Sequence, residues 1–195
     1  MTDSMQQMAL DTLGAYFGYT SFRPGQDRMV DAILAGRDAL GVMPTGAGKS
    51  ICYQVPALML PGITFVVSPL LSLMEDQTRA LLAAGARPSY LNSSLTPAQQ
   101  NTVLKRAREG RYQLMYVAPE RLLEPRFGAV QDLLRVRHTL FLPVFQHPPD
   151  GSALDVAERV VVMLHVIAGL CRAARRFFRR AVARFDAFER GQPLL

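Results

Sequence analysis

The chain has 195 residues, of which 49% are hydrophobic, and this is enough for one α/β domain with its own core. Its net charge of +6 fits a nucleic-acid partner, although charge alone fits any basic soluble protein equally well. Two cysteines without metal-ligand spacing exclude a disulfide framework, the polar N-terminus excludes a signal peptide, and the longest apolar run, 160–170, is too short to span a bilayer.

Helices and strands alternate in the predicted elements, which is typical of an α/β fold with a mainly parallel sheet flanked by helices. In chain order we expect helix 5–17, helix 24–36, strand 39–43, a helix from 49 to 60, strand 63–67, helix 70–84, strand 88–92, helix 97–110 and strand 112–117. Thr96-Pro97-Ala98-Gln99 predicts a capping box with proline at the first helical position. Ligands of such sheets bind at the carboxyl ends of strands, where the loop after residue 43 falls.

That loop reads Met-Pro-Thr-Gly-Ala-Gly-Lys-Ser over Met43–Ser50. The strict phosphate-loop pattern is G-x-x-x-x-G-K-[ST], and only its first position, Met43, does not match. Gly46 and Gly48 let the backbone curl around an anion, so that successive N–H groups and the helix N-terminus face the phosphates. An ordinary glycine-rich turn is the alternative, and a lysine followed by a serine at a helix start argues against it.

Residues 10–127 resemble the amino-terminal RecA-like domain of RecQ-type ATP-dependent DNA helicases. Blocks of sequence carry the resemblance in the family's order: 17–26 (FGYTSFRPGQ), 43–50, 67–77 (VSPLLSLMEDQ), 91–95 (LNSSL) and 116–122 (YVAPERL). RecQ-type loops commonly begin with methionine and proline, which accounts for Met43. The resemblance implies a partial RecA-like phosphate-loop domain that uses ATP and Mg²⁺ and acts on single-stranded or forked DNA in recombination and repair.

The resemblance also implies roles for individual residues. Arg23 and Gln26 would contact adenine, because a glutamine amide donates and accepts across its edge, and Arg23 or Tyr19 would stack on the ring. The residues expected to bind ATP are Tyr19, Arg23, Gln26, Thr45, Gly46, Ala47, Gly48, Lys49 and Ser50. Lys49 would hold the β/γ-phosphates as the catalytic phosphate contact, and Ser50 would ligate Mg²⁺. The expected nucleic-acid contacts are Ser68, Pro69, Leu70, Gln77, Asn92, Ser93, Pro119, Glu120 and Arg121. Simple helix capping explains Ser68 and Pro69 about equally well.

One part of the family pattern is missing. In RecQ-type helicases a strand soon after the last block ends in Asp-Glu-x-His, where the aspartate holds Mg²⁺ and the glutamate activates water. Here the candidate strand 138–142 runs into Pro-Val-Phe-Gln-His at 143–147, with no carboxylate. We therefore expect a truncated nucleotide-binding fragment that is inactive alone. The alternatives are a stand-alone ATP- or nucleic-acid-binding module and a non-functional gene remnant.

Composition changes after residue 127, where a divergent tail (128–195) begins. The tail has ten arginines and no lysine, a proline-rich stretch at 143–149 and a predicted long basic amphipathic helix from 152 to 188. Foreign sequence, a helix that covers a bare sheet face, and a helix that binds nucleic acid or an anionic membrane surface remain alternatives for it.

Overall fold

The computed structural model describes residues 3–37, 39–44, 46–68, 70–118, 121, 137–139 and 159–164. Its elements are α1 (Asp3–Phe17), α2 (Gln26–Leu34), β1 (Ala39–Pro44), α3 (Lys49–Met59), β2 (Ile63–Val67), α4 (Leu71–Ala83), β3 (Pro88–Leu91), α5 (Pro97–Arg108), β4 (Leu114–Val117), β5 (Arg137–Thr139) and β6 (Arg159–Leu164). Up to β4 every predicted element is present, within two residues at most ends. Within these residues no helix is both long and apolar enough to cross a bilayer.

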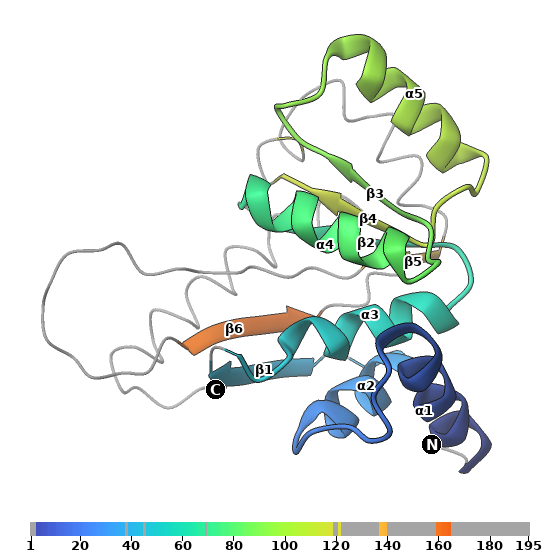
Figure 1. Cartoon of the computed structure of the whole chain (residues 1–195), viewed down its shortest axis with the longest axis vertical. Helices are drawn as coiled ribbons and strands as arrows, with labels where there is room; N and C mark the ends of the chain where they lie inside the picture. The colour runs from blue at the N-terminus through green and yellow to red at the C-terminus, as the bar shows by residue number, and fades with distance from the viewer. Residues whose placement is uncertain are drawn as a thin grey trace, which may run out of the picture.

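A parallel sheet forms the centre of the fold, in the strand order β3-β4-β2-β5 (Figure 1). Leu91, Val117 and Val67 end neighbouring strands at matched register. The carboxyl ends of β3, β4 and β2 therefore lie along one edge. β2 reads Ile-Thr-Phe-Val-Val and is buried at every position, as expected for a parallel strand covered on both faces. The α/β fold class is confirmed.

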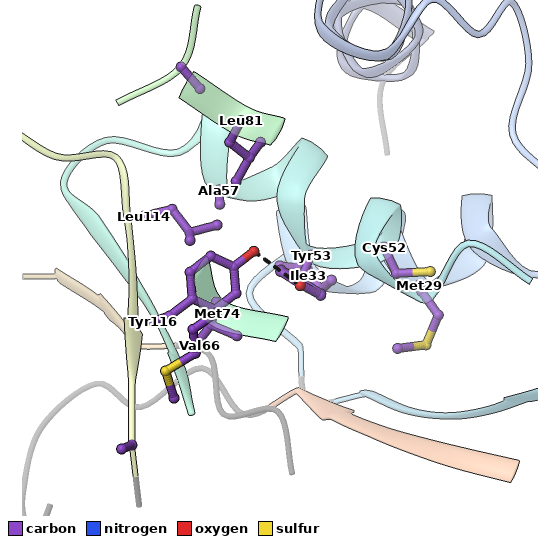
Figure 2. Close-up of a cluster of buried hydrophobic side chains, with 12 residues drawn as sticks. Met29, Ile33, Cys52, Tyr53, Ala57, Val66, Met74, Leu81, Leu114 and Tyr116 are labelled. Atoms are coloured by element: carbon purple, nitrogen blue, oxygen red, sulfur yellow. Dashed lines mark hydrogen bonds between the residues drawn. The ribbon is translucent and has the colours of Figure 1, made fainter. Parts of the chain in front are cut away.

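Side chains alternate along the strands between two apolar cores. Val66 and Tyr116 face α3 and α4, where they join Met74 and Ala57 (Figure 2). The opposite face packs against α5 through a second cluster that includes Phe65, Met115, Val117 and Ala107. Because α3 and α4 cover one face of the sheet and α5 covers the other, a shift of one residue in β2 or β4 would turn its side chains toward the wrong core. The register of these strands is therefore fixed by the side chains that enter each core.

A third apolar cluster holds α1, α2 and α3 together. Leu13 of α1, Val30 of α2 and Val55 of α3 are each almost fully buried in it. In Figure 1 these helices lie together below the sheet. This cluster brings the start of α2, and with it the first sequence block, next to the loop that precedes α3.

The capping box of α5 forms as predicted. Thr96 Oγ1 accepts from the Gln99 N–H at 3.3 Å, and Gln99 Oε1 accepts from the Thr96 N–H at 2.8 Å. Two donors at the helix start are thus satisfied by local side chains.

Two expectations for the strands are corrected. β1 was expected in the parallel sheet, but the structure pairs it antiparallel with β6, from Ala39↔Leu164 to Pro44↔Arg159. Residues 159–164 were expected in a long helix, but they form β6. Arg-Val-Val-Val-Met-Leu contains three successive β-branched residues, which lose side-chain freedom in a helix and favour a strand. The rest of the predicted tail helix lies outside the described residues.

Candidate nucleotide site and nucleic-acid edge

The phosphate loop leads directly from β1 into α3. Gly48 is the N-cap of α3 with φ 75° and ψ 37°, and Gly46 has φ 78°. Both angles lie in the left-handed region that glycine adopts without a Cβ penalty. Gly48 has no side chain that could cap α3, and its carbonyl oxygen accepts from the Ile51 N–H at 3.1 Å. Thr45 lies outside the described residues.

Lys49 and Ser50 open the first turn of α3 and are both half-buried. Lys49 Nζ lies 3.5 Å from the Met43 carbonyl oxygen, so the ammonium folds back over the loop. Ser50 contacts the Tyr53 phenol one turn later on the same helix. A cationic group and a hydroxyl therefore lie together at the positive end of the α3 dipole.

The first sequence block is hydrogen-bonded to the loop. Gln26 is 3% exposed, and its Nε2 donates to the carbonyl oxygens of Ala47 and Gly48, both at 3.0 Å. The Arg23 guanidinium donates to the Gly46 oxygen at 2.8 Å. Gln26 Oε1 also accepts from the Arg23 backbone N–H at 2.9 Å. The structure thus brings Arg23 and Gln26 next to 46–50, with the Gln26 amide bonded to the loop backbone, and their contact with a nucleotide stays a prediction. Tyr19 is 50% exposed.

An open hollow of about 810 Å³ lies between α2 and β1 and reaches the loop at Met43 and Ala47. Arg23 and Ala47 line it together with Arg28, Arg37 and Asp31. Three arginines against one aspartate make this wall attractive to an anion. Arg28 and Arg37 belong to no motif, so the sequence gives no sign that they line the hollow.

The described residues fit a nucleotide with Mg²⁺. A Cβ on Gly48 would lie 2.5 Å from Gln26 Nε2, so the loop closes around that glycine, whereas a Cβ on Gly46 would meet nothing within 4 Å. A helix N-terminus, an ammonium and a hydroxyl are the groups that bind phosphate oxygens and a hard cation. Lys49 would hold the phosphates and Ser50 the metal.

Three of the residues expected to contact nucleic acid, Ser68, Asn92 and Arg121, follow the ends of β2, β3 and β4 in the chain. Ser68 is 2% exposed, and its Oγ accepts from the Leu70 N–H at 3.3 Å. Asn92 is fully buried, and its Oδ1 accepts from the Ser94 backbone N–H at 3.0 Å. The Arg121 guanidinium donates to the Asn92 carbonyl oxygen at 3.3 Å. Ser68 and Asn92 therefore shape turns in this structure, and their contact with nucleic acid stays a prediction.

The other predicted contacts differ in accessibility. Ser93 is exposed, Leu70 is half-buried, and Pro69, Pro119 and Glu120 lie outside the described residues. Gln77 is half-buried, and its Oε1 accepts from Gln54 Nε2 at 2.7 Å.

Gln54 belongs to a buried polar network that sequence patterns did not reveal. Its Nε2 also donates to the Tyr116 hydroxyl at 3.1 Å, and the Tyr116 and Tyr53 hydroxyls are 3.2 Å apart. Figure 2 shows the two phenols pointing toward one another between α3 and β4. Tyr53, Gln54 and Tyr116 occupy positions whose spacing indicates core, and that signal does not identify which neighbours carry polar groups.

Burial governs the titration of this region. Burial raises the pKa of Tyr53, against a smaller lowering by its hydrogen bonds with Tyr116 and Ser50. Burial and the neighbouring Tyr53 raise the pKa of Tyr116 well above its usual range. Burial also raises the pKa of the Cys52 thiol to about 11. All three groups are neutral at physiological pH, and Cys52 is an inert core thiol.

Comparison with known proteins identifies the family of this chain. A family model for DEAD/DEAH box helicases matches residues 23–139. The chain is 50% identical over 123 residues to the ATP-dependent DNA helicase RecQ of Pasteurella multocida, covering 63% of this chain and 20% of that relative. It is 50% identical over 119 residues to the protein of the same name from Haemophilus influenzae, covering 61% of this chain and 19% of that relative. With the ATP-dependent DNA helicase Q-like 5 of Arabidopsis thaliana it shares 44% over 126 residues, covering 65% of this chain and 14% of that relative.

The chain thus spans about a fifth or less of the length of these relatives. The predicted resemblance to RecQ-type helicases is confirmed over the N-terminal part of the chain. The family model covers Arg23, the whole phosphate loop and β5, and it extends over more than half of the residues, so the chain belongs to the DEAD/DEAH box helicase family.

Proposed function

We propose that this chain is the nucleotide-binding part of a RecQ-type ATP-dependent DNA helicase and that it binds ATP with Mg²⁺ at the phosphate loop. One observation carries the proposal: Arg23 and Gln26 are hydrogen-bonded to the loop that places Lys49 at the start of α3. The block 17–26 and the phosphate loop, which are separate in sequence, are thus joined by hydrogen bonds, which supports a shared role in nucleotide binding.

Each group has a chemical task in this proposal. The left-handed Gly46 and Gly48 turn the backbone N–H groups toward the phosphates, and Lys49 moves from the Met43 carbonyl to the β/γ-oxygens. Ser50 supplies a hydroxyl oxygen to the metal. Mg²⁺, when bound, neutralises part of the triphosphate charge. The arginine-lined hollow beside Ala47 adds positive potential around the same ligand.

We propose the sheet edge after β2, β3 and β4 as the surface for single-stranded or forked DNA, with recombination and repair in the cytoplasm as the setting. Support comes from the exposed Ser93 and from Arg121, which lies against Asn92 at this edge. Ser68 and Asn92 hold the turns that present their exposed neighbours. Backbone contacts of this kind position a strand without reading its sequence.

For hydrolysis we propose that this chain alone binds ATP without appreciable turnover. Residues 138–149, which include the end of β5 and the stretch after it, contain no Asp or Glu. Phosphoryl transfer relies on carboxylates that hold the metal and orient water, and their loss costs several orders of magnitude in rate. This observation favours a binding module as the second candidate function.

The test is titration of the full chain with a fluorescent ATP analogue and Mg²⁺. Lys49→Ala removes a charge-assisted phosphate contact worth about 1.5–3 kcal/mol, so the dissociation constant is expected to rise by at least about tenfold. Lys105→Ala is the matched control, because Lys105 is the only other lysine and lies in the last turn of α5. Equal binding by wild type and Lys49→Ala would show that the phosphate site is wrongly assigned. Robust DNA-stimulated ATPase activity would contradict the binding-only proposal.

A further inference from the structure

The buried polar network described above links three elements. Gln54 and Tyr53 come from α3, Tyr116 from β4 and Gln77 from α4. Gln54 is 3% exposed and Tyr116 is 2% exposed, so water has little access to their polar atoms. Both amide hydrogens of Gln54 are used, one on Gln77 and one on Tyr116. The side chain is therefore held in a single orientation.

The network lies between the helix that follows the phosphate loop and the helix that carries part of the block 67–77. Gln54 follows Ser50 by four residues on α3, so the two side chains lie on the same face of the helix. Gln77 lies on α4 and is the last residue of the block 67–77, which begins at the carboxyl end of β2 and continues into α4. A purely apolar contact between α3 and α4 would tolerate sliding, whereas directed hydrogen bonds between buried groups fix one register. The core beside it is otherwise apolar, with Met74, Ala57 and Val66 (Figure 2).

We infer that Gln54, with the Tyr53–Tyr116 hydroxyl pair, is a positioning residue that couples occupation of the phosphate loop on α3 to the nucleic-acid block on α4. The inference rests on the proposed function, because it needs a nucleotide at one end and DNA at the other. A shift of the first turn of α3 on nucleotide binding would be transmitted through Gln54 to Gln77 and the block before it. Coupling between binding sites is reciprocal, so DNA would change nucleotide affinity by the same factor.

The test measures that factor directly. Affinity of the full chain for a labelled oligo-dT strand is measured by fluorescence anisotropy, with and without a non-hydrolysable ATP analogue and Mg²⁺. In wild type the two affinities are expected to differ by about fivefold or more. Gln54→Met keeps side-chain length without hydrogen bonds and should bring the ratio close to one while nucleotide affinity stays within about twofold.

A second variant and a control guard against a general packing effect. Tyr116→Phe removes only the hydroxyl that accepts from Gln54 and should also lower the ratio. Thr78→Val is the matched control, because Thr78 is also buried, on α4, but its hydroxyl has no partner within the described residues. Thermal unfolding checks that each variant is folded.

The outcomes separate the inferred coupling through Gln54, called the relay below, from the proposed function. A wild-type chain that does not bind the nucleotide analogue overturns both. Nucleotide binding with a wild-type ratio of one overturns the relay alone, as does an unchanged ratio in both Gln54→Met and Tyr116→Phe. A ratio lowered as much by Thr78→Val shows a packing effect and also overturns it.

Discussion

Replacing Gly48 by alanine tests the closest approach in the site. The new Cβ would lie 2.5 Å from Gln26 Nε2, a distance that real Cβ contacts do not reach, so the Gln26 amide has to move. Moving it breaks two hydrogen bonds, to the carbonyl oxygens of Ala47 and Gly48. At about 0.5–1.5 kcal/mol each, their loss costs roughly 1–3 kcal/mol. The left-handed backbone at φ 75° adds about 1–2 kcal/mol for a residue with a Cβ.

Gly46→Ala is the matched control for this change. Its backbone is equally left-handed at φ 78°, but a Cβ there meets nothing within 4 Å. The same backbone cost and the same gain from a less flexible unfolded chain apply to both variants, so they cancel in the comparison. The free energy of unfolding is therefore expected to fall by roughly 1–3 kcal/mol more in Gly48→Ala than in Gly46→Ala.

Urea denaturation of the two single variants measures this difference, and Gln26→Ala provides the second arm. With the Gln26 side chain removed, the extra cost of Gly48→Ala should vanish, because no amide remains to be displaced. Equal destabilisation by Gly46→Ala and Gly48→Ala, or an excess that persists in the Gln26→Ala background, would refute the assigned contact.

Two further predictions concern the core and α5. Burial raises the pKa of Cys52 from 9.0 to about 11, so the unfolded chain loses this proton first. The contribution of this neutral thiol to the free energy of unfolding is therefore fully present below pH 9 and is lost between about pH 9 and 11, by on the order of 2–3 kcal/mol. The urea midpoint of unfolding should fall less steeply with pH in Cys52→Ala than in wild type across this range. Equal slopes in the two proteins would contradict the assignment. Thr96→Ala should cost about 1 kcal/mol by removing the capping box, whereas Thr102→Ala, an exposed site within α5, should be nearly neutral; similar losses in both would show that the cap does not matter.

Local signals explain why most elements up to β4 were predicted from the sequence. The run Ile-Thr-Phe-Val-Val has the length and composition of a buried strand, and β2 occupies those residues. Thr96 and Gln99 define a helix start through contacts three residues apart, which need no knowledge of the rest of the fold. The loop at 46–50 was predictable for the same reason, because its glycines and lysine are adjacent.

The sequence did not predict which strands pair with each other or which buried side chains are in contact. The apolar run at 39–43 predicts a strand but not its neighbour, and β1 pairs with β6, which is more than one hundred residues away in the chain. Asn92 matched a nucleic-acid block, yet the structure buries it completely beneath its own turn. Gln54 belongs to no sequence pattern that predicts a role, and its proximity to Tyr116 and Gln77 appears only in the fold. Such facts depend on tertiary contacts, which composition and periodicity do not encode.

Gln26 connects the two tasks of the nucleotide site. The resemblance predicted an amide that reads adenine, whereas the structure shows that amide donating to Ala47 and Gly48 and accepting from Arg23. One side chain cannot direct the same two hydrogens to the loop and to a base at once. If Gln26 recognises adenine, nucleotide binding must release the loop carbonyls, and loop shape and base recognition become thermodynamically linked. If it remains on the loop, it preorganises the phosphate cradle, and adenine depends on Arg23 and Tyr19. Because the Gly48 and Gln26 variants act on this single contact, nucleotide titrations in the same set separate the two roles: loss of affinity in Gln26→Ala that Gly48→Ala reproduces identifies the cradle, and loss confined to Gln26→Ala identifies the base.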